Sequence, residues 1–363
     1  MRVSIQRGLA ARDILLRTDQ DMAANRDLDV AELQAFRLRE PGSRRGFTLL
    51  RLKTRSGIEG HGECRPASPE DEAFARAQVL GKAATSYEVI GHQLAARPGV
   101  RAAVDMALLD IVGKATKAPV YQLLGGPTRF KVRVVIPLEG DTDEALVTSL
   151  KRAEAAGYRC HMVPVPAARA KSQAFVDATK KRLESLRQAG SGSTNFLLDG
   201  AGKLPIAGAS DLCAALERFH LLWFDEPCRM SNARTVSRLA GENVTPVGFG
   251  RDIEECGTFQ DLLRESAVDI LRPDIRTHGI SQIRRLAAIA ETYYVAVAPF
   301  HDGGPVGTAA SMHLAASLPN SFAVQLPSAN GTAEDGYAEL PRGPGLGVDV
   351  SKEFLEKHKE QPA

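Results

Sequence analysis

Charged and imidazole side chains follow several short apolar runs in the second half of this 363-residue sequence. Asp199 ends the run FLLD, Asp225 follows LLWF, and Arg251 follows VGFG. Asp274 follows DILRP, and His301 lies two residues beyond VAVAP. Carboxylates can hold a divalent cation, a guanidinium can hold a carboxylate, and an aspartate–histidine pair can move a proton. If these side chains meet, they could perform acid–base chemistry on a small anionic molecule.

These apolar runs alternate with helical patterns, which cover 143–156, 168–189, 212–219 and 281–292. The runs are VRVVI (132–136), HMVPV (161–165), FLLD (196–199), LLWF (221–224), VGFG (247–250), DILRP (269–273), VAVAP (295–299) and FAVQL (322–326). Eight strand candidates joined by helices over about 200 residues favour a (β/α)₈ barrel over an open doubly wound sheet. In such a barrel the active site forms at the carboxyl ends of the strands, where the charged residues lie.

A different pattern precedes the barrel. Residues 30–38 alternate in polarity and 47–53 are rich in strand formers, with a turn signal at 41–43 between them. Apolar residues then recur at helical spacing over 100–114. Strands followed by helices, without alternation, predict an α+β module. We therefore divide the chain into a polar arm (1–29), an α+β domain (30–128), the barrel (129–326) and a C-terminal segment (327–363).

The composition limits the partners and the location that we expect. The formal net charge is +2 with no basic block, which argues against nucleic acid or an anionic membrane as a partner. No stretch approaches the roughly 20 apolar residues of a membrane-spanning helix, and the start lacks the apolar core of a signal peptide. Five scattered cysteines are typical of the reducing cytoplasm rather than of a disulfide framework. We expect a cytoplasmic protein that acts on a small molecule.

Five segments resemble, in order and spacing, the signatures of a known family. They are RAAVDMALLDIVGKATKAPVYQLLGG (101–126), WFDEP (223–227), LRPDIRTHGIS (271–281), APFHDGGPVGTAASMHLAASLPN (298–320) and DGYAELPRGPGLGVDV (335–350). The chain thereby resembles the mandelate racemase/muconate lactonising enzyme-like group of the enolase superfamily. The resemblance implies a modified (β/α)₈ barrel of the TIM type with an N-terminal α+β capping domain, to which the C-terminal segment returns. It also implies a homo-oligomer.

The chemistry of this family begins with removal of a proton α to a carboxylate. That proton is barely acidic, so Mg²⁺ bound by three carboxylates stabilises the enediolate while a lysine or histidine takes the proton. The resemblance therefore implies a small carboxylate-containing substrate such as a sugar acid. It also implies a lyase (dehydratase) or an isomerase (racemase or cycloisomerase).

The metal-ligand positions of the family are only partly kept. Asp199 and Asp225 match two of the three carboxylate ligands, but Arg251 stands at the third, after a strand that usually ends Gly-Glu. A guanidinium stays protonated and cannot ligate a cation. We therefore expect remnant ligands at Asp199 and Asp225, no cofactor, and Arg251 as the electrophile for the substrate carboxylate. Weak Mg²⁺ binding is the alternative.

The acid–base positions also differ from the family pattern. Both lysine positions of the second strand are replaced, by Met162 and Pro164. The sixth-strand aspartate is kept as Asp274, but the seventh-strand histidine position falls on Phe300, with His301 one residue later. We predict that Asp274 and His301 form the acid–base pair.

Four further residues of basic or hydrogen-bonding type lie near strand ends and are predicted to bind substrate. They are Arg272, which stands where the family's Q-P-D motif has glutamine, and Arg276, His161 and Gln325. Two functions stay open from the sequence, beside a third possibility that an unrelated reaction uses the same pocket, because a barrel fold does not fix the chemistry. The first is an enzyme that abstracts the proton α to a carboxylate. The second is a catalytically inactive descendant that serves in ligand binding or assembly, which the lost lysines and the lost metal ligand favour.

Overall fold

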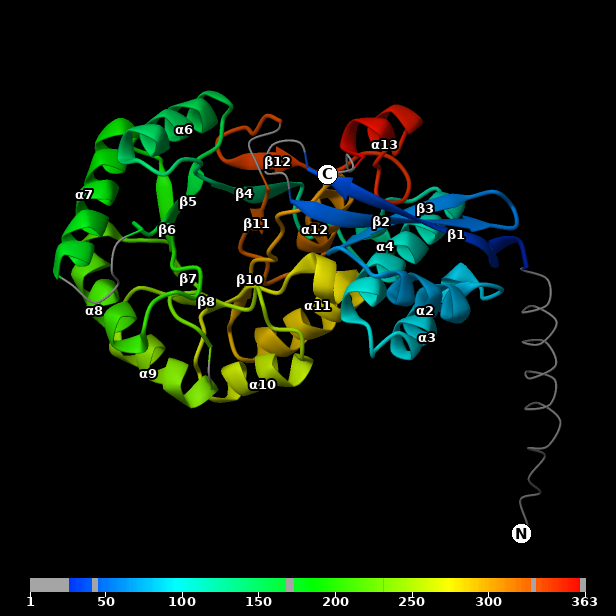
Figure 1. Cartoon of the computed structure of the whole chain (residues 1–363), viewed down its shortest axis with the longest axis horizontal. Coiled ribbons are helices and arrows are strands. Elements are labelled where there is room, and N and C mark those ends of the chain that lie inside the picture. The colour runs from blue at the N-terminus through cyan, green and yellow to red at the C-terminus, as the bar shows by residue number, and fades with distance from the viewer. Residues whose placement is uncertain (1–25, 41–44, 168–172, 231, 328–330, 360–363) are drawn as a thin grey trace, which may run out of the picture.

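A computed structural model describes residues 26–40, 45–167, 173–230, 232–327 and 331–359. Figure 1 shows two parts side by side: a small sheet with helices, and a ring of strands enclosed by helices. Most of the predicted polar arm, residues 1–25, lies outside the described residues. The described chain begins with a short 3₁₀ helix, η1 (Arg26–Leu28).

The first part is a three-stranded antiparallel sheet covered by helices. Its strands are β1 (Val30–Arg39), β2 (Gly46–Thr54) and β3 (Glu59–Cys64), in the order β1-β2-β3. Its helices are α2 (Pro69–Val79), η2 (Ala84–Ser86), α3 (Tyr87–Gln93), α4 (Pro98–Ala115) and α5 (Val120–Leu123). The close approach of α4 to β3 requires glycine, because a Cβ atom at Gly62 would lie 1.7 Å from the carbonyl oxygen of Ala103.

The second part is a parallel barrel. Its strands are β4 (Lys131–Pro137), β5 (Cys160–Pro164), β6 (Asn195–Asp199), β7 (Phe224–Asp225), β8 (Val247–Phe249), β9 (Ile270–Leu271), β10 (Ala296–Val297) and β11 (Val324–Gln325). Neighbouring strands are parallel in the order β10-β9-β8-β7-β6-β5-β4-β11. A bridge between Val297 and Ser321, just before β11, joins the two ends of this order. The predicted barrel with an N-terminal α+β capping domain is confirmed.

Helices surround the barrel, as Figure 1 shows. They are α6 (Asp143–Ala155), α7 (Gln173–Ala189), α8 (Ile206–Leu216), η3 (Glu217–Phe219), α9 (Ala233–Glu242), α10 (Cys256–Arg264), α11 (Ile275–Thr292) and α12 (Pro305–Ser317). The barrel interior is filled by one buried cluster of side chains from the strands and their flanks: Val135, Cys160, Met162, Leu197, Trp223, Ile270, Ala298 and Ala323. No helix in the described part of the chain is long and apolar enough to cross a membrane.

The C-terminal segment returns to both parts. Strand β12 (Tyr337–Glu339) pairs antiparallel with β4, and helix α13 (Lys352–His358) lies beside the capping sheet (Figure 1). Between them, the backbone N–H of Leu346 donates to the carboxylate of Asp110 on α4 over 2.8 Å. The same carboxylate accepts from the backbone N–H of His61 and from Lys114, so one buried aspartate ties three segments together.

Two more buried acids of the capping domain hold it on the barrel. Glu63 accepts backbone N–H groups of Gly304 and Gly307 at the start of α12 over 2.6 and 3.1 Å. Asp105 accepts the backbone N–H of Ser281 over 2.9 Å and its hydroxyl, at a break in α11. The break lies at Gly279, whose φ of 69° favours glycine. Because both acceptors are buried, the orientation of the cap is fixed by satisfied hydrogen bonds.

A pH-dependent contribution to stability follows from Asp105. Burial raises the pKa of Asp105 from 3.8 to about 6, although hydrogen bonds from Ser281 oppose the rise. The folded state therefore binds this proton more tightly than the unfolded chain. The resulting stabilisation is full below pH 3.8 and is lost as the pH rises to 6. Relative to Asp105→Asn, which cannot titrate, the wild type should lose up to about 3 kcal/mol of unfolding free energy over this range.

Urea unfolding of both proteins at several pH values measures this difference. Asp211→Asn, on an exposed position of α8, is the control and should show no such trend. A difference between wild type and Asp105→Asn that does not change with pH would contradict the assignment.

Candidate active site

Two cavities lie at the carboxyl ends of the barrel strands, where the sequence predicted the site. Their volumes are about 410 and 540 Å³. Arg251 and Phe300 line both cavities, so they form a shared wall. Other polar residues line the smaller cavity only: Arg65, Glu226, Asp252 and Arg276. A different set lines the larger cavity only, including Met162, Asp199 and Gln325.

The guanidinium of Arg251 lies between the two remnant carboxylates. Nη1 donates to Asp199 Oδ2 over 3.3 Å, Nη2 donates to Asp199 Oδ1, and Nη2 lies 3.1 Å from Asp225 Oδ2. The side chain of Arg251 is 11% exposed and that of Asp225 is fully buried. Burial opposes the charged form of Arg251, but the carboxylates of Asp225 and Asp199 outweigh burial and raise its pKa. The arginine therefore stays protonated.

Asp225 also accepts hydrogen bonds from two side chains inside the barrel. Trp223 Nε1 and Arg272 Nε each donate to Asp225 Oδ1 over 2.7 Å. Gly248 on the next strand leaves room for this arrangement, because a Cβ atom there would lie 2.7 Å from Trp223 Cδ1 and 3.0 Å from Asp225 Oδ1. The carboxylate is thus fixed by an indole and two guanidinium groups.

Arg272 was predicted to bind substrate, but it is fully buried and is not among the residues that line the two cavities. Its Nη1 donates to the carbonyl oxygen of Ala298 over 2.7 Å, and its Nη2 donates to Gln325 Oε1. The sequence could not show that this side chain points to the barrel axis. Gln325, also a predicted substrate residue, does line the larger cavity while it holds Arg272.

Asp274 organises a second charged group at the junction of cap and barrel. It caps α11 by accepting the backbone N–H of Arg276 over 2.8 Å, and it accepts Arg65 Nε over 3.0 Å and Arg276 Nη2 over 3.3 Å. Burial alone would raise the pKa of Asp274, but Arg276 and Arg65 outweigh it and lower the pKa. Arg276 also pairs with Asp302, which in turn pairs with Arg45 of the capping domain. Asp274 therefore positions arginines rather than facing the cavities.

The structure does not bring Asp274 and His301 together. His301 is fully buried, and its Nε2 lies 2.8 Å from the carbonyl oxygen of Gly304. Its ring packs on α12, where a Cβ atom at Gly307 would lie 2.4 Å from its Cε1. Among the interactions of the described residues, none joins His301 to Asp274. Phe300 faces the site instead, with its ring centroid 5.1 Å from the guanidinium carbon of Arg251.

His161 also lies away from the cavities. It is fully buried on the outer side of β5, with its ring centroid 6.2 Å from that of Phe196. Burial lowers the pKa of His161 to about 4, so the ring is neutral at physiological pH. The predicted role in substrate binding does not agree with this position, because strand alternation turns His161 to the opposite side from Met162.

Several residues of the site carried no clear signal in the sequence. Arg45 and Arg65 come from the capping domain, more than 180 residues before the barrel residues Arg251 and Asp302 that they contact.

Glu226 is the second acid of WFDEP and was not assigned a role. Its Oε1 accepts the backbone N–H groups of Gly250 and Arg251 over 2.6 and 2.8 Å, and burial raises its pKa to about 7.

The donors around Asp199 and Asp225 do not fit Mg²⁺. This ion requires oxygen ligands in near-octahedral geometry. Here the nitrogen atoms of Arg251 contact both carboxylates, and a permanently charged guanidinium repels a cation. In the described part of the chain, no group of three or more His, Cys, Asp or Glu side chains is arranged to hold a metal ion.

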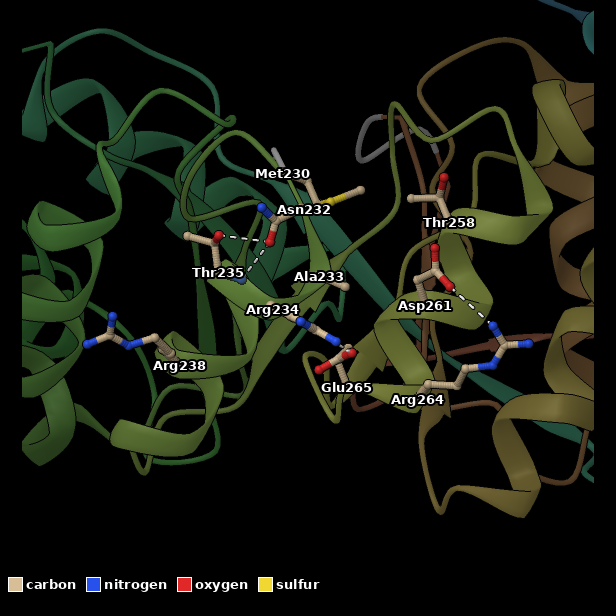
Figure 2. A pocket seen from close by; sticks show the side chains of 10 residues that line it. All are labelled: Met230, Asn232, Ala233, Arg234, Thr235, Arg238, Thr258, Asp261, Arg264 and Glu265. Carbon is tan, nitrogen blue, oxygen red and sulfur yellow. Dashed lines mark hydrogen bonds and ion pairs between the residues drawn. The ribbon is translucent and has the colours of Figure 1, made fainter.

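A third cavity, of about 810 Å³, lies between α9 and α10 on the outside of the barrel. Figure 2 shows two pairs of charged side chains in it, Arg234 beside Glu265 and Arg264 beside Asp261. These pairs are exposed to solvent and therefore weak. The cavity contains none of the residues that converge at the strand ends, so we place the candidate active site at Arg251.

Comparison with known proteins agrees with this fold. Residues 42–125 match the mandelate racemase/muconate lactonizing enzyme N-terminal domain, and residues 145–354 match the enolase C-terminal domain-like family. The chain therefore belongs to the mandelate racemase/muconate lactonising enzyme-like group of the enolase superfamily.

Curated relatives and solved structures of this group are similar to the chain over most of its length. A D-galactonate dehydratase from Ralstonia pickettii is 32% identical over 287 residues, which are 72% of this chain and 74% of that protein. A D-xylonate dehydratase from Haloferax volcanii is 26% identical over 86% of this chain and 85% of that protein. A mandelate racemase/muconate lactonizing enzyme-like protein from Roseovarius sp. TM1035 has a TM-score of 0.84 at 25% identity, covering 92% and 96% of the two chains.

Removal of the Arg251 charge should destabilise the fold. Arg251→Met leaves Asp199 without its bidentate partner and Asp225 with one guanidinium fewer, and an unpaired buried charge of this kind costs about 3–5 kcal/mol. Chemical denaturation measures the loss. Arg238→Met, in an 80% exposed side chain of α9, is the matched control and should change stability by less than about 1 kcal/mol. Equal effects of the two substitutions would contradict the electrostatic role of Arg251.

Proposed function

We propose that this protein is a sugar-acid dehydratase, a lyase that binds the substrate carboxylate through Arg251 without a metal ion. The observation that carries the proposal is the position of Arg251. Its guanidinium lies between two aspartates at the strand ends and lines both cavities. Its relatives named D-galactonate and D-xylonate dehydratase support a polyhydroxy acid as substrate.

Arg251 has donors to spare for a substrate. A guanidinium carries five N–H groups, and the contacts to Asp199 and Asp225 use only Nη1 and Nη2. Because two carboxylates already fix its orientation, little conformational entropy is lost when a third carboxylate binds. The same positive charge would stabilise the enediolate that develops on the substrate carboxylate after deprotonation.

The proposed reaction is an elimination of water. A base removes the proton on the carbon α to the carboxylate, and the electron pair forms a double bond to the β carbon as its C–O bond breaks. The leaving hydroxyl takes a proton and departs as water, and the enol product tautomerises to a 2-keto acid. Three carboxyl groups line the smaller cavity beside Arg251, those of Glu226, Asp252 and Asp302, and we assign proton transfer to Glu226 and Asp302.

A second candidate function is ligand binding without turnover. Met162 lines the larger cavity where the family has a lysine, and the His301 ring faces α12. Neither feature impairs the recognition of a carboxylate by Arg251. The two functions therefore share a binding site and differ only in proton transfer.

Binding should be independent of metal. D-Galactonate, D-xylonate and other aldonates, screened by thermal shift and isothermal titration, should include a ligand that binds the wild type equally well in EDTA and in Mg²⁺. Arg251→Met should weaken binding of that ligand about 100-fold, because a charge-assisted contact to the substrate carboxylate is lost. Arg238→Met should bind as the wild type does. A strict requirement for Mg²⁺ would overturn the proposed role of Arg251.

Deuterium exchange separates the two functions. Incubation of the bound acid in ²H₂O, followed by NMR, should show deuterium at the α carbon of recovered substrate or at the β carbon of the 2-keto acid product, where the enol takes up a solvent proton. Glu226→Gln combined with Asp302→Asn should reduce this rate at least about 100-fold, the range typical of lost general acid–base catalysis. Binding without exchange by the wild type would support the ligand-binding function and reject the dehydratase.

A further inference from the structure

Arg272 is the second arginine that stands where the family pattern has an uncharged or acidic residue. It follows β9 and lies fully buried on the barrel axis beneath Arg251. Its guanidinium carbon lies 5.3 Å from the ring centroid of Trp223 and 5.8 Å from that of Phe300. A buried cation needs a compensating charge, so the role of Arg272 depends on which carboxylate is its counter-ion.

The counter-ion is Asp225. Arg272 Nε donates to Asp225 Oδ1 over 2.7 Å, and Nη2 donates to Oδ2 over 3.4 Å. Trp223 Nε1 adds a second donor to Oδ1, and Arg251 Nη2 lies 3.1 Å from Oδ2. A carboxylate has about four lone-pair sites. Three hydrogen bonds and the ion-pair contact of Arg251 therefore surround the two oxygens of Asp225, at the positions that a metal ion would need.

The four charged groups also balance. Arg251 and Arg272 carry two positive charges, and Asp199 and Asp225 carry two negative charges. The charges of this four-residue cluster cancel without any ion; the neighbouring Glu226, which accepts the backbone N–H of Arg251, is not part of it. A divalent cation added to it would leave two uncompensated positive charges in a largely buried site, which is strongly unfavourable at low effective dielectric constant.

We infer that Arg251 and Arg272 act as a pair that together replaces the two charges of the family's divalent cation, with Arg272 withholding Asp225 from any metal. The inference deepens the proposed metal-free function and rests on it. Arg272 is a positioning residue, because it fixes Asp225 and, through Asp225, the guanidinium of Arg251. It follows from this inference that replacing Arg251 alone by glutamate does not rebuild a metal site.

The test rebuilds the family's residues in the full-length chain. Arg251→Glu restores the third carboxylate, and Arg272→Gln restores the neutral residue of the Q-P-D motif. We expect Arg251→Glu/Arg272→Gln to bind Mg²⁺ at least about tenfold more tightly than Arg251→Glu alone, by isothermal titration and by the Mg²⁺-dependent shift in Tm. The wild type should show no Mg²⁺ binding at millimolar concentrations.

Arg251→Glu/Arg272→Lys is the matched control. It carries the same disturbance at both positions but keeps the positive charge beside Asp225, so its Mg²⁺ affinity should equal that of Arg251→Glu. Equal affinities of the Gln and Lys double variants would overturn the inference, and so would Mg²⁺ binding by the wild type. The titrations contain no sugar acid, so a failure of the proposed dehydratase function would not change their result.

If the double variants do not fold, a measurement of stability on other variants still tests the inference. Arg272→Gln should lower the Tm of the wild type, because it leaves a buried carboxylate with one cation fewer. In an Asp225→Asn background the same substitution should lower the Tm by less than half as much, because the charge to be balanced is gone. Equal losses of Tm in the two backgrounds would show that Arg272 serves packing alone and would overturn the inference.

Discussion

The charge balance between two aspartates and two arginines at the strand ends is the constraint on which the site depends. Asp225 is fully buried and the side chain of Asp199 is 15% exposed, and unpaired carboxylates in that environment would be costly or protonated. Ion pairs with Arg251, which lines the cavities, and with Arg272, which lies inside the barrel, offset this cost. The pocket therefore keeps the positive charge of Arg251 in its wall, balanced by protein groups.

A second network couples the capping domain to the same site. Buried Glu63 and Asp105 hold the cap on α12 and α11, so the orientation of the cap is set by hydrogen bonds remote from the cavities. This orientation places Arg65 against Asp274 and against the backbone carbonyl of Arg251. Both domains thus line the smaller cavity, and a disturbance of either buried acid should reach it through Arg65.

Local patterns were enough to predict the barrel, its cap and the place of Arg251. Periodic apolar runs indicate the strands and helices, and Arg251 directly follows one of these runs. The predicted pairing of Asp274 with His301 does not form in the structure, because spacing alone does not decide whether Phe300 or His301 faces the barrel axis, and Phe300 does. Arg272 was assigned to substrate because a sequence does not reveal how deep a strand-end side chain lies. The roles of Arg65 and Arg45 depend on contacts between distant segments, which no local pattern encodes. The homo-oligomer stays a prediction.

Trp223, the single tryptophan of the chain, has its indole N–H on Asp225 and the guanidinium of Arg272 at 5.3 Å from its ring. Indole fluorescence responds to nearby charge and to hydrogen bonding at the ring nitrogen. The protein therefore carries an intrinsic optical reporter at the centre of its charged cluster, free of background from other tryptophans. Any rearrangement of Asp225 changes the emission of this one residue, so events in the pocket are visible without a label.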